Sequence, residues 1–153
     1  MLIRTEDGPT EFTDDKAYYC SGFVSLTEKR EYACNLVKSN YQEYCSQGLL
    51  CTDNSVEYTI DNDDKTRDET AKKLFDLDKN IQTSFDWTMD NPKVKITFAN
   101  EQATITFLKS VKCLIASNEV KLRDKKTEVG NFTLEQVDAF IDNPTYPTYE
   151  RTV

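Results

Sequence analysis

The chain has 153 residues, the length of one ordinary globular domain. Its net charge of −8 argues against binding to nucleic acid or to an anionic membrane surface, because both need clustered Lys and Arg. No stretch approaches the roughly 18 apolar residues of a transmembrane helix, and the N-terminus lacks the apolar core of a signal peptide. We therefore expect a cytosolic protein whose five cysteines are reduced.

The first 24 residues are mixed in sign and show no clear periodicity. We predict an irregular or extended N-terminal arm over residues 1–24. Its adjacent tyrosines, Tyr18 and Tyr19, are candidates for contact with a partner.

A helix is predicted to begin after Ser25, because Ser25 and Glu28 have the spacing of a capping box, in which two side chains satisfy free backbone N–H groups. Gly48 is the expected stop. The apolar face of this helix has a helical spacing and consists of Cys34, Val37, Tyr41 and Cys45.

Alternating apolar residues predict a first hairpin over residues 49–60. A four-residue turn would set Cys51 opposite Val56 and Leu49 opposite Tyr58, with the apolar side chains on one face. The acidic run that follows predicts the start of a second helix, since carboxylates favour the positive end of the helix dipole.

The single tryptophan, Trp87, lies in a second predicted hairpin around the turn at residues 90–93. The predicted pairs are Phe85 with Phe98, Trp87 with Ile96 and Met89 with Val94. All six side chains share one face in this register, so we predict that Trp87 is a core residue and not an exposed binding residue.

Asn100 is predicted to cap a long third helix with a broad apolar stripe, which would close the core against the second hairpin. The predicted core consists of Phe85, Trp87, Ile96, Phe98, Phe107, Leu108, Val111, Leu114 and Ile115. A second capping box, Thr133 and Gln136, predicts a short fourth helix.

Two prolines prevent that helix from continuing, so residues 143–153 are predicted to form an extended tail. Its Tyr146, Pro147 and Tyr149 are further candidates for a partner interface. The predicted fold is α+β, with two β-hairpins alternating with three helices, a short C-terminal helix, extended termini and one compact domain over residues 25–142.

No pattern in the sequence points to catalysis. The chain has no histidine, which removes the commonest general base and most catalytic zinc sites. The cysteines lack the close pairs of a zinc knuckle, and a calcium loop starting at Asp61 would have Lys65, Thr66 and Lys72 at positions that need other residues. Four scattered glycines form no phosphate-binding loop. We predict no catalytic, cofactor-binding or metal-binding residues.

The order of motifs from about residue 28 to residue 142 resembles an uncharacterised domain family found in tail, tail-fibre and tail-fibre-assembly proteins of tailed bacteriophages. The matching pieces are the hairpin ending in "YTID", the helix start "DDKTRDET", the tryptophan hairpin "FDWTMDNPKVKITFANEQ" and the closing helix "NFTLEQVDAF". At the helix start, Thr66 and Arg67 stand where the family has Ser-Arg.

The resemblance implies a non-enzymatic structural or interaction protein, located in the host cytoplasm during assembly and then in the virion tail. Its expected partners are other tail or fibre proteins in an oligomeric assembly, with no nucleic acid, membrane or cofactor. Two alternatives stay open: a tail-fibre assembly chaperone, and an acidic intracellular effector that binds a basic host protein.

Overall fold

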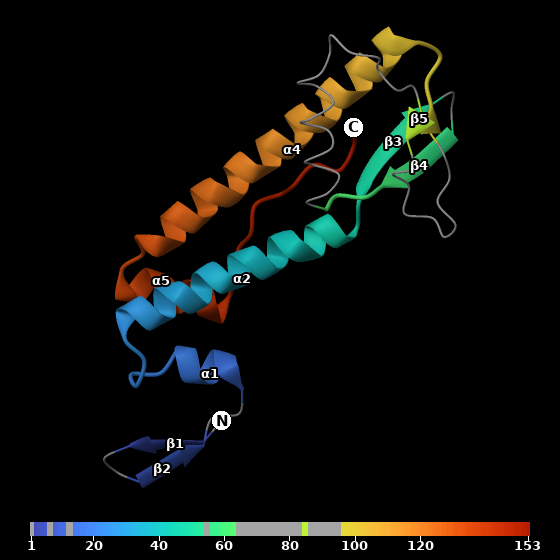
Figure 1. Ribbon diagram of the computed structural model, residues 1–153. Coiled ribbons are helices and arrows are strands. Elements are labelled where there is room, and N and C mark those ends of the chain that lie inside the picture. Colours follow the sequence, from blue (N-terminus) through green and yellow to red (C-terminus); the bar gives the residue numbers. More distant parts are fainter. Residues whose placement is uncertain (1, 6–7, 12–13, 54–55, 64–83, 86–95) are drawn as a thin grey trace. The chain divides into compact units, whose positions relative to one another are not determined.

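The computed structural model describes residues 2–5, 8–11, 14–53, 56–63, 84–85 and 96–153. These residues form helices and antiparallel strand pairs, so the predicted mixture of helix and sheet is confirmed (Figure 1). The alternation of two hairpins with three helices stays a prediction. The second predicted helix and the centre of the tryptophan hairpin, including Trp87, Met89 and Val94, lie outside the described residues.

The chain divides into two compact units. The compact domain over residues 25–142 stays a prediction. The first unit comprises residues Met1–Asn40 and Leu122–Pro147. The second unit comprises Tyr41–Lys121 and Thr148–Val153. Each unit thus combines segments that are far apart in the sequence.

The first unit combines elements from the N-terminal and the C-terminal parts of the chain. Its elements are β1 (Leu2–Thr5), β2 (Gly8–Glu11), α1 (Asp15–Tyr19), the beginning of α2 (Leu26–Ser46), the end of α4 (Glu101–Gly130) and α5 (Leu134–Asp142). The irregular or extended arm predicted over residues 1–24 is therefore not confirmed. Strands β1 and β2 pair antiparallel, and Asp14 caps α1 by accepting a hydrogen bond from the Ala17 N–H at 2.7 Å.

Both predicted capping boxes are present in the first unit. At the start of α2, the Ser25 N–H donates to Glu28 Oε2 at 3.3 Å and the Glu28 N–H donates to Ser25 Oγ at 3.2 Å. At the start of α5, Thr133 and Gln136 exchange the same two bonds at 2.9 and 3.2 Å. These caps satisfy backbone N–H groups that have no partner inside the helix.

One apolar cluster holds the first unit together. It joins α2, the end of α4 and α5, and its buried members are Ala33, Val37, Val129, Val137, Phe140 and Ile141. The rings of Tyr19 and Tyr32 and the side chain of Cys20 pack around this cluster and are partly buried. Burial of the cluster is what fixes α5 against α2, since each buried side chain of this size stabilises the fold by about 1.5–3 kcal/mol.

The second unit contains a strand pair, β3 (Leu49–Asp53) and β4 (Val56–Ile60). The predicted register was wrong by two residues, because the observed register sets Cys51 opposite Tyr58 and Leu49 opposite Ile60. Only residues 54 and 55 separate the two strands. A shift of two residues keeps every side chain on its face, so Leu49, Cys51 and Ile60 are still buried.

The second strand pair, β5 (Ser84–Phe85) and β6 (Ile96–Thr97), shows the same kind of error. Phe85 lies opposite Ile96, whereas the sequence suggested Phe98. Phe98 instead follows β6, and its ring centroid lies 4.7 Å from that of Phe107 on α4.

The predicted caps of the two long helices are confirmed. Asn100 Oδ1 accepts a hydrogen bond from the Ala103 N–H at 2.8 Å at the start of α4. Helix α2 ends at Ser46, and Gly48 follows with a φ of 72°, a backbone conformation that favours glycine. Of the predicted core residues on α4, Leu108, Val111 and Ile115 are buried, and Phe107 and Leu114 are half-buried.

Candidate functional site

A pocket in the first unit collects tyrosines and carboxylates. Its volume is about 270 Å³, and its lining residues are Tyr18, Tyr19, Glu28, Glu31, Tyr32 and Asn35. Helix α1 provides the first two tyrosines. The other four residues lie on α2 at i, i+3, i+4 and i+7, a spacing that places them on one face of that helix. We call this feature the acidic aromatic pocket.

The three tyrosine rings of the pocket contact one another. Tyr19 stacks on Tyr32 with ring centroids 3.9 Å apart and planes within 4°. Tyr18 meets Tyr19 edge-on at 5.0 Å. Because Tyr19 and Tyr32 also pack against the apolar cluster, the fold holds their rings in place before any partner arrives.

The pocket is electrostatically negative. Among the described residues, no lysine or arginine lines it. Lys16 and Lys29 form ion pairs with Asp142 and Asp138, and Arg30 donates to the Phe132 carbonyl. The pKa of the Tyr32 phenol is raised, first by burial and then by the negative charge of Asp15. A negative cavity of this kind attracts a cation.

Two polar side chains of the pocket keep their hydrogen-bonding capacity for a ligand. One oxygen of Glu28 accepts the capping bond from the Ser25 N–H. The side chains of Glu31 and Asn35 make no hydrogen bond or ion pair with any residue that the structure describes. The Glu31 carboxylate, which is exposed, is therefore the principal acceptor that the pocket offers.

The sequence-predicted interface residues fall in different places. Tyr18 and Tyr19 line the pocket. Tyr146 belongs to the same unit, is 37% exposed, and its ring lies edge-on to Phe140 at 6.1 Å. It is also near enough to Tyr32 to raise the pKa of that phenol. Pro147 ends the unit and is half-buried.

Tyr149 lies in the second unit and packs against its own chain. Its ring centroid is 5.2 Å from that of Tyr41 and 4.9 Å from that of Tyr44. Its hydroxyl oxygen is buried and, among the described residues, has no hydrogen-bond partner. Tyr149 is half-buried, and part of its ring contacts these two helical tyrosines of its own chain. Its contact with a partner stays a prediction.

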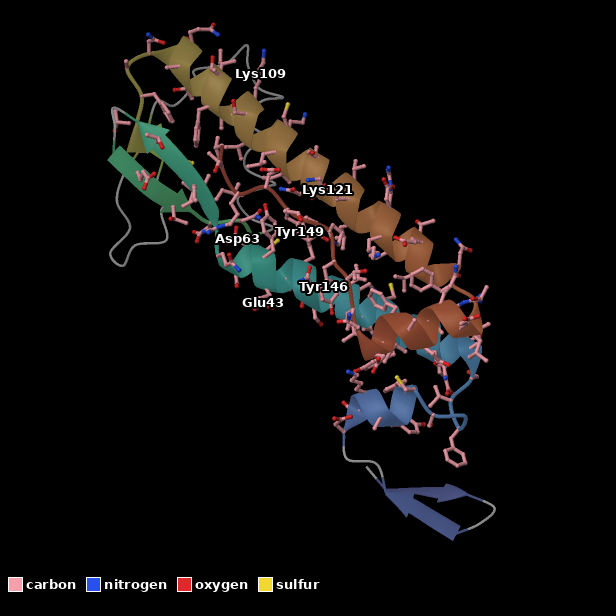
Figure 2. All side chains as sticks on the ribbon, turned by 180° about the vertical axis from the view of Figure 1, so that it is seen from behind. Glu43, Asp63, Lys109, Lys121, Tyr146 and Tyr149 are labelled. Atoms are coloured by element: carbon pink, nitrogen blue, oxygen red, sulfur yellow. The ribbon has the colours of Figure 1, made fainter. Side chains whose placement is uncertain are left out.

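The C-terminal segment is also held, so an extended free tail is not confirmed. It forms a parallel bridge to β3, in which the Leu50 N–H donates to the Arg151 carbonyl at 2.7 Å and the Val153 N–H donates to the Leu50 carbonyl at 2.8 Å. Lys121 Nζ donates to the Thr148 carbonyl at 2.9 Å. Figure 2 shows Lys121 on α4 and Tyr149 on this segment.

Sequence reasoning missed the α2 half of the pocket. The sequence analysis places Glu28 in a helix cap and gives no role to Glu31, Tyr32 and Asn35. Their i, i+3, i+4, i+7 spacing was available as a signal. The sequence offers only a single capping residue, Asp14, for α1, and nothing in it indicated that this helix brings Tyr18 and Tyr19 to that face.

No group of three or more His, Cys, Asp or Glu side chains that could hold a metal ion occurs among the residues that the structure describes.

The five cysteines are free thiols. Cys113 is exposed on α4, whereas Cys51 on β3 is buried. Burial raises the pKa of Cys51 from 9.0 to about 12.

This contrast predicts the order of cysteine alkylation. We expect iodoacetamide at about pH 8.5 to modify Cys113 readily and Cys51 only after unfolding, because the thiolate is the nucleophile. Peptide mass spectrometry with and without urea measures both sites. Since the folded pKa of Cys51 is raised, its contribution to stability is complete below pH 9 and is lost as the pH rises towards 12. Rapid modification of Cys51 in the native protein would contradict its burial.

The described fold and pocket define a mixed helix-and-sheet protein with an acidic aromatic surface pocket. None of the described helices is long and apolar enough to cross a membrane. No family model, no curated protein and no solved structure matches the chain. The resemblance to the bacteriophage tail family therefore stays a prediction.

Proposed function

We propose that the chain is a non-enzymatic interaction protein of a bacteriophage tail or tail fibre, and that it holds a partner chain at the acidic aromatic pocket. The observation that carries the interaction role is the pocket itself, with three tyrosines and two glutamates around a cavity of about 270 Å³. The tail context is supported by the order of sequence motifs.

The residue types in the pocket are those of protein interfaces. Tyrosine is enriched at interfaces because its ring provides a large contact area with few rotatable bonds and its hydroxyl forms hydrogen bonds. The stacked rings of Tyr19 and Tyr32 are already ordered, so binding costs little side-chain entropy there. The carboxylates of Glu28 and Glu31 favour a partner with a basic surface.

Mass spectrometry of purified virions tests the tail assignment. We expect peptides of this chain in the particles, at a copy number that is a fixed ratio of the other tail proteins. An assembly chaperone would be abundant in infected cells and missing from particles. Absence from both preparations would contradict the phage assignment altogether.

The acidic charge favours one further candidate, an intracellular effector that binds a basic host protein. The net charge of −8 and the negative pocket support it. Capture of host proteins at low and high salt separates the candidates, because binding driven by charge weakens as salt screens it. Capture of a basic host protein at low salt, lost at high salt, together with absence from virions, would favour the effector.

A further inference from the structure

We propose that the acidic aromatic pocket receives a single arginine side chain from a basic segment of a partner protein. This inference rests on the proposed function, since it assumes that the pocket is where the partner binds. It adds the chemical identity of the group that enters. Three properties of the pocket favour arginine: its size, its charge and its aromatic surface.

The size of the pocket suits one side chain. Pockets for small-molecule ligands typically measure about 300–1,000 Å³. The cavity here, at about 270 Å³, falls just below that range. It has room for one long side chain that projects from a larger partner.

The charge of the pocket favours a cation. Glu28 and Glu31 line it, and in the described part of the chain no lysine or arginine does. The Glu31 carboxylate has no hydrogen bond or ion pair within the described part of the chain, so both of its oxygens are available to a donor. Asn35 beside it provides an amide oxygen that has no described partner either.

The aromatic surface favours arginine over lysine. A guanidinium is flat, stacks on aromatic rings and donates two parallel N–H bonds to one carboxylate. Three tyrosine rings and the Glu31 carboxylate line the same cavity, so one guanidinium could contact a ring and the carboxylate together. The lysine ammonium is a compact, strongly hydrated charge that would use the ring surface less well.

Titration of the ¹⁵N-labelled protein with short capped peptides tests the inference. The probe is acetyl-Gly-Arg-Gly-amide, and its analogues carry lysine or citrulline, the uncharged isostere of arginine. We expect the arginine peptide to shift amide resonances of α1 and the first two turns of α2, with a Kd on the order of millimolar. The lysine peptide should bind several-fold more weakly, and the citrulline peptide should cause no comparable shifts.

Matched variants locate the site. Glu31→Gln should weaken binding of the arginine peptide about three- to tenfold, since it removes a charge-assisted hydrogen bond. Glu43→Gln makes the same change of charge at an exposed glutamate of α2 that does not line the pocket, and should leave the Kd unchanged (Figure 2). Tyr18→Ser, outside the buried cluster, should also weaken binding while the circular dichroism spectrum stays native.

The possible outcomes separate the inference from the proposed function. Equal shifts with citrulline and arginine, or equal losses in Glu31→Gln and Glu43→Gln, would overturn the arginine site. Tighter binding of the lysine peptide would overturn the choice of arginine. If no peptide binds but the chain is present in virions, the tail role stands and this inference fails. If the arginine peptide binds as expected and virions lack the chain, the pocket assignment stands and the tail role fails.

Discussion

The variant Asn118→Ala is expected to lower the free energy of unfolding by about 3 kcal/mol. Asn118 on α4 is 1% exposed and makes three hydrogen bonds inside the second unit. Its Nδ2 donates to the Tyr44 hydroxyl at 2.7 Å and to the Glu150 carbonyl at 2.9 Å. Its Oδ1 accepts the Glu150 N–H at 3.0 Å. The Asn118 side chain therefore links α4 to Tyr44 on α2 and to Glu150 in the C-terminal segment.

The size of the effect follows from the groups that lose their partners. A buried donor left without an acceptor costs about 1–3 kcal/mol, and each further lost hydrogen bond costs about 0.5–1.5 kcal/mol. The Glu150 N–H, whose bond to Asn118 is partly buried, would lose its acceptor. The Glu150 carbonyl would keep its bond from the Tyr44 hydroxyl at 2.5 Å, which limits the loss. Removal of the Tyr44 hydroxyl alone, in Tyr44→Phe, should therefore have a smaller effect than Asn118→Ala.

Urea unfolding measures the change in free energy, and carboxypeptidase digestion measures release of the C-terminal segment. We expect Asn118→Ala to lose C-terminal residues faster than the wild type does. Ser117→Ala, at the exposed neighbouring position of the same helix, is the matched control and should change neither quantity. A variant Asn118→Ala as stable and as resistant as Ser117→Ala would show that these three bonds do not hold the segment.

The variant Asp138→Ala is expected to destabilise the protein by a similar amount, about 3 kcal/mol. Its carboxylate accepts a hydrogen bond from Lys29 Nζ at 2.5 Å, and Lys29 is 2% exposed. Removal of one partner of a buried ion pair typically costs about 3–5 kcal/mol, because the remaining charge is buried without compensation. Since Asp138 itself is partly exposed, we expect a value at the lower end.

A second carboxylate on α5 provides the control. Asp142 pairs with Lys16 at 3.4 Å, and both side chains are largely exposed. Such surface pairs contribute little, so Asp142→Ala should change the free energy of unfolding by less than about 0.5 kcal/mol. The double variant Lys29→Met and Asp138→Ala should recover part of the loss, because no unpaired charge is then buried. Equal effects of Asp138→Ala and Asp142→Ala would contradict the burial of Lys29.

Local signals in the sequence predicted the starts of α2, α4 and α5 and the end of α2. The capping boxes at Ser25 and Thr133, the cap at Asn100 and the stop at Gly48 were all confirmed. Each of these signals depends on side-chain and backbone groups within four residues of each other. The missed helix α1 has such a cap as well, Asp14, but at five residues it is too short to show an apolar period.

The strand registers were predicted less well. Both were wrong by two residues. Alternation in sequence determines which side chains share a face but does not distinguish registers that differ by two. In the pairing of β3 with β4, Thr52 lies opposite Glu57 and Asp53 lies opposite Val56. The register of a hairpin depends on the length of its turn.

The sequence by itself determined the mixed helix-and-sheet class, the ends of the long helices, the acidic charge and the apolar stripe of α4. Only the tertiary structure decided that Tyr18 and Tyr19 meet Glu31 and Tyr32 in one pocket, and that the ring of Tyr149 contacts Tyr44 of its own chain. The physical reason is the distance along the chain over which each kind of interaction acts. Caps and periodicity act over a few residues, whereas these contacts depend on burial of apolar surface between segments far apart in the chain, which no local pattern encodes.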